Sequence, residues 1–252
     1  MNEADRMRIA GRVLESCSKH PKQAAFVADR ARKKLARCAR RAGKSHGAAC
    51  DLIISSLLYP NETVLGIAVS AGKANELMGQ PMERACGQLG IATEHTTVHG
   101  MRGLRFPWGG VVLLAGCANR AECEKFRGDR AARVHIDEPE VLGAFLPSLL
   151  DEVIEPRLLD LNGVLSMSGT PGATLAGAFY EADEGDRSKG WEQHSWTILD
   201  NPFIPHERKV AYLEEKRKTL SDGPYFREYE GRWFHDPEAL CFPYDPTRNR
   251  VW

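Results

Sequence analysis

The segment from Cys38 to Ser45, Cys-Ala-Arg-Arg-Ala-Gly-Lys-Ser, carries the clearest chemical signal in this chain. It ends in Gly-Lys-Ser, as a phosphate-binding loop does, but Cys38 stands where such a loop opens on glycine. In these loops, backbone N–H groups surround phosphate oxygens at the start of a helix. Lys44 would reach the β- and γ-phosphates, and the Ser45 hydroxyl would bind Mg²⁺. Cys38 departs from the pattern, because cysteine adopts a positive φ less readily than glycine.

The sequence on either side of this loop supplies the elements that it needs. A short half-apolar run at 35–39 predicts a strand, and residues 48–58 are apolar enough for a buried helix. Strand, loop and helix in this order form the context of a phosphate loop, whereas Gly-Lys-Ser alone is common by chance. We therefore predict a nucleotide site whose loop ligands are Arg40, Arg41, Ala42, Gly43, Lys44 and Ser45.

Pro21-Lys22-Gln23 lies just before the first predicted strand. The amide of Gln23 can both donate to and accept from one edge of a base, so at this distance from the loop it predicts an adenine contact. The alternative is a surface glutamine at the start of a helix.

A predicted buried strand at 131–136 ends in two acids, Asp137 and Glu138. Acids at the end of a buried strand are costly unless they have a function. In phosphate-loop enzymes the first acid holds Mg²⁺ and the second polarises the attacking water. The alternative is a strand that ends in solvent, where acids cost little. The upstream phosphate loop favours the catalytic interpretation.

The predicted strand 163–168 ends in Ser168-Gly169-Thr170. Small hydroxyl residues at a strand's carboxyl end lie where ligands bind in such sheets, so these residues could couple the γ-phosphate to movement elsewhere. A plain turn explains them almost as well.

The remaining hydrophobic pattern alternates between strands and helices, which predicts a three-layer α/β fold of the P-loop NTPase type with a mainly parallel central sheet. We expect an ATPase core at 1–184, a small C-terminal lid at 185–235 and a linker at 236–252. The other predicted strands lie at 63–70, 96–105, 110–115 (the last two as a hairpin) and 191–199, and the other predicted helices at 1–20, 73–89, 141–160, 206–220 and 225–230.

Charge and length are those of a large globular domain without a global field. The chain has 252 residues, with 34 basic and 34 acidic ones. Eight basic residues and no acid lie between Arg30 and Lys44. This cluster is either a solvated face beside an anion site or a contact for phosphate or DNA backbone.

Seven cysteines are scattered without paired CxxC spacing; Cys117 and Cys123 are the closest pair, and no zinc-type partner group follows them. We expect free thiols in a reducing cytosol. The N-terminus lacks the apolar core of a signal peptide, and no apolar run is as long as a membrane span. The sequence therefore predicts a soluble intracellular protein.

Taken in order, these segments resemble the ATPase domain of the large subunit of a tailed-bacteriophage terminase, the motor that packages DNA into procapsids. The loss of the first glycine is a habit of that family. Each segment is weak alone, but the ordered set spans residues 20–235. The resemblance rests on Pro21-x-Gln23, Arg40-Arg41-x-Gly43-Lys44-Ser45, Ile136-Asp137-Glu138, Ser168-Gly169-Thr170-Pro171, Asp200-Asn201-Pro202 and Glu230-Gly231-Arg232-Trp233-Phe234.

The resemblance implies roles by position: Gln23 on adenine, Asp137 and Ser45 on Mg²⁺, Glu138 activating water, and 168–170 coupling hydrolysis to motion. It also implies an arginine finger, an effect worth ~10³–10⁵ in rate. Arg40 or Arg41 could act from within the loop. Arg127 could act on a neighbouring subunit and is favoured, although a solvated loop charge would look the same.

The implied function is ATP hydrolysis that moves double-stranded DNA into a viral procapsid in the host cell cytoplasm. The implied partners are the portal protein and the terminase small subunit, with a homo-oligomeric ring during packaging, a possible monomer in isolation, and no membrane. In the family a nuclease follows, and we expect no nuclease activity in this chain. Two rivals stay open: a nucleic-acid helicase or remodeller, and a nucleotide-binding assembly module that does not hydrolyse.

Overall fold

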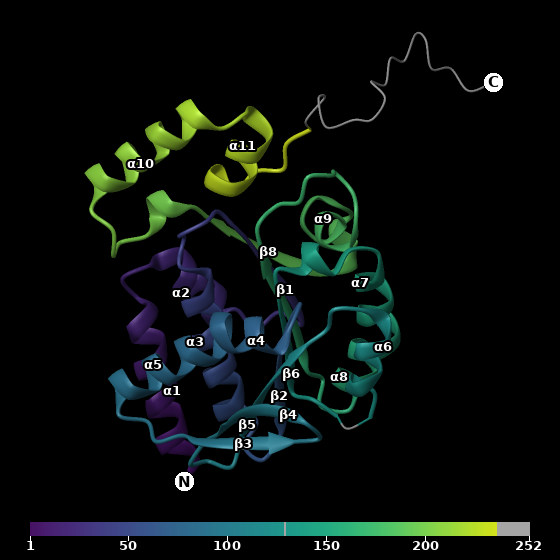
Figure 1. The fold of residues 1–252 in the computed structure, drawn as a ribbon. Helices are drawn as coiled ribbons and strands as arrows, with labels where there is room; N and C mark the ends of the chain where they lie inside the picture. Colours follow the sequence, from purple (N-terminus) through teal and green to yellow (C-terminus); the bar gives the residue numbers. More distant parts are fainter. Residues whose placement is uncertain (129, 236–252) are drawn as a thin grey trace, which may run out of the picture.

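Eight strands form one sheet in the computed structural model, which describes residues 1–128 and 130–235 (Figure 1). The strand order is β3-β4-β5-β2-β6-β7-β1-β8. From β5 to β8 all neighbours are parallel, whereas the pairs β3–β4 and β4–β5 are antiparallel, so only β4 runs against the other strands. The predicted mainly parallel α/β sheet is confirmed. The strands are β1 (Lys33–Cys38), β2 (Thr63–Ala68), β3 (Glu94–Val98), β4 (Met101–Arg105), β5 (Val111–Gly116), β6 (Arg133–Asp137), β7 (Val164–Gly169) and β8 (Trp191–Trp196).

Helices cover both faces of this sheet, α1 to α5 on one side and α6 to α9 on the other (Figure 1). Each side has its own apolar core cluster. No helix within 1–128 or 130–235 is long and apolar enough to cross a membrane. The helices are α1 (Glu3–Cys17), α2 (Pro21–Ala28), α3 (Lys44–Leu58), α4 (Ala71–Ala74), η1 (Asn75–Gly79), α5 (Gln80–Leu89), α6 (Arg120–Cys123), η2 (Glu124–Phe126), η3 (Pro139–Phe145), α7 (Leu146–Ser148), η4 (Leu149–Ile154), α8 (Glu155–Leu159), α9 (Ala178–Glu184), η5 (Arg187–Lys189), η6 (Ile198–Asp200), α10 (His206–Thr219) and α11 (Asp222–Glu230).

The register of the central strands brings the predicted site residues to one edge. Helices bury both faces of the central strands, so β2 and β5 are mostly apolar, whereas β6 alternates Val134 and Ile136 with the buried polar side chains of Arg133, His135 and Asp137. Asp137 of β6 is paired with Ser168 of β7, and Gly169 of β7 is paired with Arg37 of β1. The carboxyl ends of β6, β7 and β1 therefore meet where the phosphate loop begins.

Two predicted elements are divided in the structure. The strand expected at 96–105 is a second hairpin, β3 and β4, which turns at His99 and Gly100 with φ of 48° and 77°. The helix expected at 141–160 is a series of short helical pieces from η3 to α8. Gly143, at φ 57° and ψ −138°, interrupts its first part.

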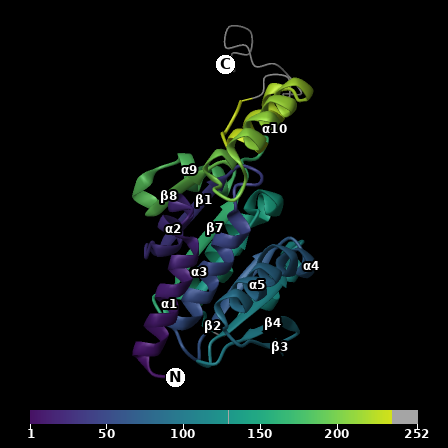
Figure 2. The same cartoon turned by 90° about the vertical axis from the view of Figure 1, so that its left-hand side faces the viewer.

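Part of the segment expected as a lid, 185–235, belongs to the sheet. Strand β8 pairs with β1 along six residues as the edge strand. Helices α10 and α11 lie beyond this edge region, above the sheet in Figures 1 and 2. The expected linker, 236–252, lies outside the described residues.

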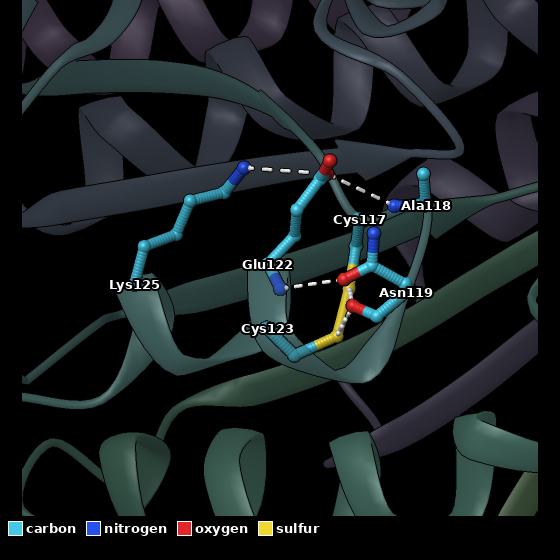
Figure 3. Close-up of a disulfide and its surroundings, with 6 residues drawn as sticks. All are labelled: Cys117, Ala118, Asn119, Glu122, Cys123 and Lys125. Carbon is cyan, nitrogen blue, oxygen red and sulfur yellow. Dashed lines mark hydrogen bonds and ion pairs between the residues drawn. A yellow bond between two sulfur atoms is a disulfide. The ribbon is translucent and has the colours of Figure 1, made fainter.

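Cys117 and Cys123 form a disulfide, which corrects the expectation that all thiols are free (Figure 3). Cys117 follows β5 and Cys123 ends α6, whose first turn is capped by Asn119. This turn brings the two Cα atoms to 5.6 Å, within the usual range for a disulfide. A spacing of six residues does not reveal such a turn in the sequence. The other cysteines of the described residues, Cys17, Cys38, Cys50 and Cys86, are free thiols.

Candidate nucleotide-binding site

The loop between β1 and α3 has the geometry of a phosphate cradle. Its two left-handed residues are Arg41, with φ 61°, and Gly43, with φ 92°. Cys38 is the last residue of β1 and fully buried, so the turn needs no positive φ there. Burial raises the pKa of the Cys38 thiol, so it packs as a neutral side chain. The cysteine at the first loop position is therefore compatible with the fold.

The N-terminus of α3 is open toward the loop. Gly43 occupies the N-cap position, and no side chain caps the first N–H groups of this 15-residue helix. Uncapped N–H groups and the helix dipole favour an anion at this end. This is the arrangement on which helix N-terminal phosphate sites depend.

Lys44 joins the loop to the two predicted acids. Its Nζ lies 3.2 Å from Oδ1 of Asp137 and forms a close ion pair with Glu138. Burial alone would lower the pKa of the ammonium, but the two carboxylates hold that pKa above its ordinary value. Lys44 is therefore a permanent cation in a site with two anions.

Residues 168–170 contact both acids. The Ser168 hydroxyl donates to Oδ1 of Asp137 at 2.8 Å, and the backbone N–H of Thr170 donates to Oε2 of Glu138 at 3.2 Å. The backbone N–H of Glu138 donates to the carbonyl of Ser168 at 2.8 Å. Gly169 lies between them, where a Cβ would come within 2.9 Å of Cδ of Pro139. The end of β7 is thus bonded directly to the acids at the end of β6.

The backbone of Glu138 is in the left-handed region, with φ 50° and ψ 57°. This conformation is uncommon for a residue with a Cβ and costs about 1–3 kcal/mol, so the surroundings must enforce it. The bonds from Thr170 and Lys44 fix the carboxylate in place. Glu138 is therefore a strained and firmly oriented acid, as catalytic groups often are.

His135 was missed in the sequence, although it lies two residues before Asp137 on the same face of β6. Its Nδ1 and Nε2 lie 2.9 Å and 3.0 Å from the hydroxyls of Ser166 and Ser168. The Ser168 hydroxyl donates its hydrogen to Asp137, so it must accept from His135. We therefore assign the ring hydrogen of His135 to Nε2. Burial lowers the pKa of His135 to about 3, so the ring is neutral. His135 thus positions Ser168, which positions Asp137.

The donor set fits a magnesium ion. Oδ2 of Asp137 is buried and has no hydrogen-bond partner, although buried carboxylate oxygens are normally paired. Ser45 lines the adjoining cavity. Carboxylate and hydroxyl oxygens are the hard ligands that Mg²⁺ prefers, and the ion keeps several waters as further ligands.

A cavity of about 760 Å³ opens over these groups, large enough for a small-molecule ligand. It is lined by the loop, by Glu138 and Thr170, and by Arg227 and Glu228 of α11. A second cavity of about 520 Å³ shares Gly43, Ser45 and His46 with it and extends toward α1 and α5.

Gln23 lines the second cavity but is almost fully buried. Its Nε2 donates to the carbonyl of Gly43 at 2.7 Å, and its Oε1 is buried without a partner. A Cβ at Gly43 would come within 3.1 Å of Nε2 of Gln23 and one at Gly47 within 3.0 Å of its Cγ, so the glutamine packs against both the loop and the start of α3. Its Oε1 is the atom left to accept from a base.

The three candidate arginines lie in different places. Arg40 and Arg41 line the larger cavity. Arg40 pairs with Glu228 of α11. Arg127 follows η2 and pairs with Glu124 of η2 and Glu152 of η4, two elements that pack on the opposite face of the sheet from α3. Arg127 is thus half-exposed and directed at its own neighbours.

The end of β8 and the segment after it support the loop through contacts that the sequence did not indicate. Asn201 donates through Nδ2 to the carbonyl of Arg41 at 2.8 Å. The N–H of Arg40 donates to the carbonyl of Glu228 at 2.7 Å, and that of Ala39 to the carbonyl of Trp196 at 3.1 Å. The motif Asp200-Asn201-Pro202 was the only signal that could have found Asn201.

No family model matches this sequence, and no curated protein does. Solved structures match its fold. The large terminase of a thermophilic bacteriophage superposes with a TM-score of 0.66 at 13% identity, over 85% of this chain and 53% of that chain. The large terminase ATPase domain of Thermus phage P74-26 superposes with a TM-score of 0.64 at 19% identity, over 85% of this chain and 94% of that domain.

This chain has the fold of a phage large-terminase ATPase domain. The resemblance found in the motifs is therefore confirmed at the level of the fold. The large terminase of bacteriophage HK97 also matches, with a TM-score of 0.55 at 17% identity over 83% of this chain. The chain spans about half the length of this terminase and of the first one, 49% and 53%. The first terminase has also been solved with ADP and with ATP-γ-S.

Proposed function

We propose that this chain is the ATPase domain of a terminase large subunit, which hydrolyses ATP to move double-stranded DNA into a viral procapsid in the host cytoplasm. The observation that carries the proposal is the convergence of Lys44, Asp137 and Glu138 beneath a cavity at the carboxyl ends of β1, β6 and β7. Ligands bind at this edge in open α/β sheets.

The residues of the site divide the work of phosphoryl transfer. The N–H groups of α3 and Lys44 bind the phosphates, and Lys44 neutralises charge as it develops on the γ-phosphate. Glu138 orients a water for attack and accepts its proton. Ser45 and Asp137 hold Mg²⁺, which supplies further charge neutralisation when bound. Gln23 contacts adenine through Oε1.

Residues 168–170 couple hydrolysis to motion, because they bond to both acids and would respond when Glu138 moves. The C-terminal segment is the second responder, since Asn201 and Glu228 hold the loop backbone. In a ring of subunits at the portal, with the small subunit as a partner, these movements would push the duplex. Contact would be mainly with the DNA backbone and therefore sensitive to salt.

An arginine completes the site. We favour Arg127 acting on the neighbouring subunit, with Arg40 and Arg41 as the alternatives from within the loop. The side chain of Arg127 is about half exposed, so a neighbour could engage it.

The testing experiment measures ATP turnover against protein concentration for the wild type, Glu138→Gln and Arg127→Ala, and for a mixture of both variants. We expect turnover per subunit to rise with concentration, and the mixture to recover activity that neither variant has alone. Binding of ATP to Glu138→Gln is followed separately. Unchanged turnover in Glu138→Gln would show that Glu138 is not the general base. Turnover that depends neither on protein concentration nor on Arg127 would instead assign the arginine finger to Arg40 or Arg41.

A further inference from the structure

Cys17, His46 and Cys50 form a cluster beside the phosphate loop. Cys17 is the last residue of α1, and His46 and Cys50 lie in the first two turns of α3. Their sulfur and imidazole nitrogen atoms all lie within 4.8 Å of one another. A separation of four residues places His46 and Cys50 on the same face of α3, and α1 packs against that helix. Both cysteines are buried free thiols, and His46 is half-buried.

The spacing of these atoms suits a tetrahedral metal ion. Sγ of Cys50 lies 3.6 Å from Nε2 of His46. Zinc binds sulfur at about 2.3 Å and imidazole nitrogen at about 2.0–2.1 Å, so tetrahedral angles put two such ligands about 3.5–3.6 Å apart. Cys50 and His46 are therefore already at ligand spacing, and Cys17 Sγ lies within 4.8 Å of both ligand atoms, close enough to join them around one ion.

We propose that Cys17, His46 and Cys50 bind a zinc ion. Two thiolates and one imidazole are a donor set that selects zinc over the hard ions that suit Asp137 and Ser45. Two thiolates also balance the charge of Zn²⁺, which lets the ion occupy a buried position. Ser16, which precedes Cys17, and His46 both line the cavity of about 520 Å³. A water from that cavity would supply the fourth ligand.

A bound zinc ion would hold the phosphate loop in place from the side of α1. His46 directly follows Ser45, so the ion would join the end of α1 to the first turn of α3. A ligand change at Cys17, in a different helix, would then weaken ATP binding together with zinc binding. The zinc proposal rests on the cluster alone and stands or falls independently of ATP hydrolysis.

Cobalt substitution tests the proposal without any activity measurement. Apoprotein is prepared with a chelator under reducing conditions and titrated with Co²⁺. We expect about one ion per chain, with a thiolate-to-cobalt charge-transfer band and the d–d bands of a tetrahedral ion. Co²⁺ on the oxygen ligands Ser45 and Asp137 gives no thiolate band, so the two sites are distinguished. Zinc then displaces cobalt and abolishes the bands.

Variants assign the ligands. Cys17→Ser and Cys50→Ser should lose the charge-transfer band, and His46→Ala should weaken it and shift the d–d bands. Cys86→Ser is the matched control, because Cys86 is also a buried free thiol but lies outside the cluster. The double variant Cys117→Ser/Cys123→Ser and the variant Cys241→Ser exclude the remaining cysteines as ligands.

Zinc should also raise the melting temperature of the wild-type apoprotein but not that of Cys50→Ser, since an ion that binds only the folded state stabilises it. Circular dichroism checks that each variant folds. If a cysteine variant does not fold, His46→Ala tests the site, because His46 is the half-buried ligand. A wild type without the thiolate band, or an unchanged band in Cys50→Ser, overturns the proposal. The proposal is also overturned if Cys17 and Cys50 form a disulfide and, once it is reduced, the two thiols still bind no ion.

Discussion

Lys44 and Glu138, 94 residues apart in sequence, form a close ion pair at the floor of the larger cavity. A phosphate that binds Lys44 must compete with this carboxylate. We therefore expect Glu138→Gln to abolish turnover and to raise ATP affinity about two- to fivefold, since a partly exposed pair is worth ~0–1 kcal/mol. Equilibrium binding of ATP and steady-state turnover measure the two effects separately.

Glu140→Gln is the matched control for this variant. Glu140 lines the same cavity, and the ion pairs of Lys44 are with Asp137 and Glu138 instead. Burial and the neighbouring Glu138 carboxylate raise the pKa of Glu140 to about 7, so the two variants are compared at about pH 8.5, where Glu140 is ionised. At that pH the removal of Glu140 should change ATP affinity less than the removal of the Glu138 charge. Equal affinities for the two variants would show that total charge in the cavity, and not the Lys44 pair, sets the competition.

A buried ion triad supports the helix that carries the loop. Asp51 of α3 accepts from Lys34 at 2.9 Å and from Arg133 at 3.0 Å, and all three side chains are at most 3% exposed. Asp51→Asn would leave two buried cations poorly compensated and should lower the free energy of unfolding by about 3–5 kcal/mol. Urea denaturation measures it.

Asp5→Asn is the control for Asp51→Asn, because Asp5 forms an exposed pair with Arg8. Its free energy of unfolding should stay within about 0.5 kcal/mol of the wild type. If Asp51→Asn costs as little as this control, then Lys34 is sufficiently served by the carbonyls of Phe26 and Asp29, to which it also donates.

The convergence of Lys44, Asp137 and Ser168 could be predicted because each follows or ends a buried parallel strand. Carboxyl ends of parallel strands meet at one edge, so identifying the strands was enough to bring these residues together. Their chemical roles remain predictions. The position of β8 could not be predicted, because its pairing with β1 joins residues far apart in sequence.

The supports of the loop were not visible in the sequence for the same reason. The carbonyl of Glu228 accepts from the N–H of Arg40, a contact that any residue type could supply, and the ion pair between their side chains joins residues 188 apart in sequence. The turn between β3 and β4 is different, since Gly100 after His99 was a legible turn signal within an apparently continuous strand. At this position the sequence contained a turn signal, but the β-like residues on both sides favoured one continuous strand.

His135 should make stability depend on acid. Burial lowers its folded pKa to about 3, whereas an unfolded histidine titrates near ~6.5. Between these values the unfolded state binds more protons. The histidine's contribution is therefore complete above about pH 6.5 and is lost as the pH falls toward 3, by up to ~1.4 kcal/mol per pH unit. His135→Gln, which cannot titrate, should show a shallower loss.

Urea denaturation of wild type and His135→Gln at several pH values between these limits measures the difference in slope. The exposed His95 provides the control, because His95→Gln removes an imidazole that lies at the surface. Parallel slopes for wild type and His135→Gln would mean that carboxylates, and not His135, set the acid sensitivity.

Gly231, at the end of α11, lies against the phosphate loop. Its φ is 62°, and a Cβ there would come within 3.0 Å of the backbone N of Ala39 and 3.2 Å of the carbonyl carbon of Cys38. Gly190, with φ 75°, has nothing within 4 Å of the position that a Cβ would occupy. Alanine at either position should cost about 1–2 kcal/mol of stability, because both need the left-handed region.

Gly231→Ala alone should also push on the loop and weaken ATP binding several-fold, whereas Gly190→Ala should leave ATP affinity unchanged. The comparison removes the backbone cost, which the two variants share, and leaves the contact between α11 and the loop. ATP affinity and urea denaturation of both variants provide the test. If both bind ATP as the wild type does, the loop tolerates displacement at Ala39, and α11 has no mechanical connection to the nucleotide site.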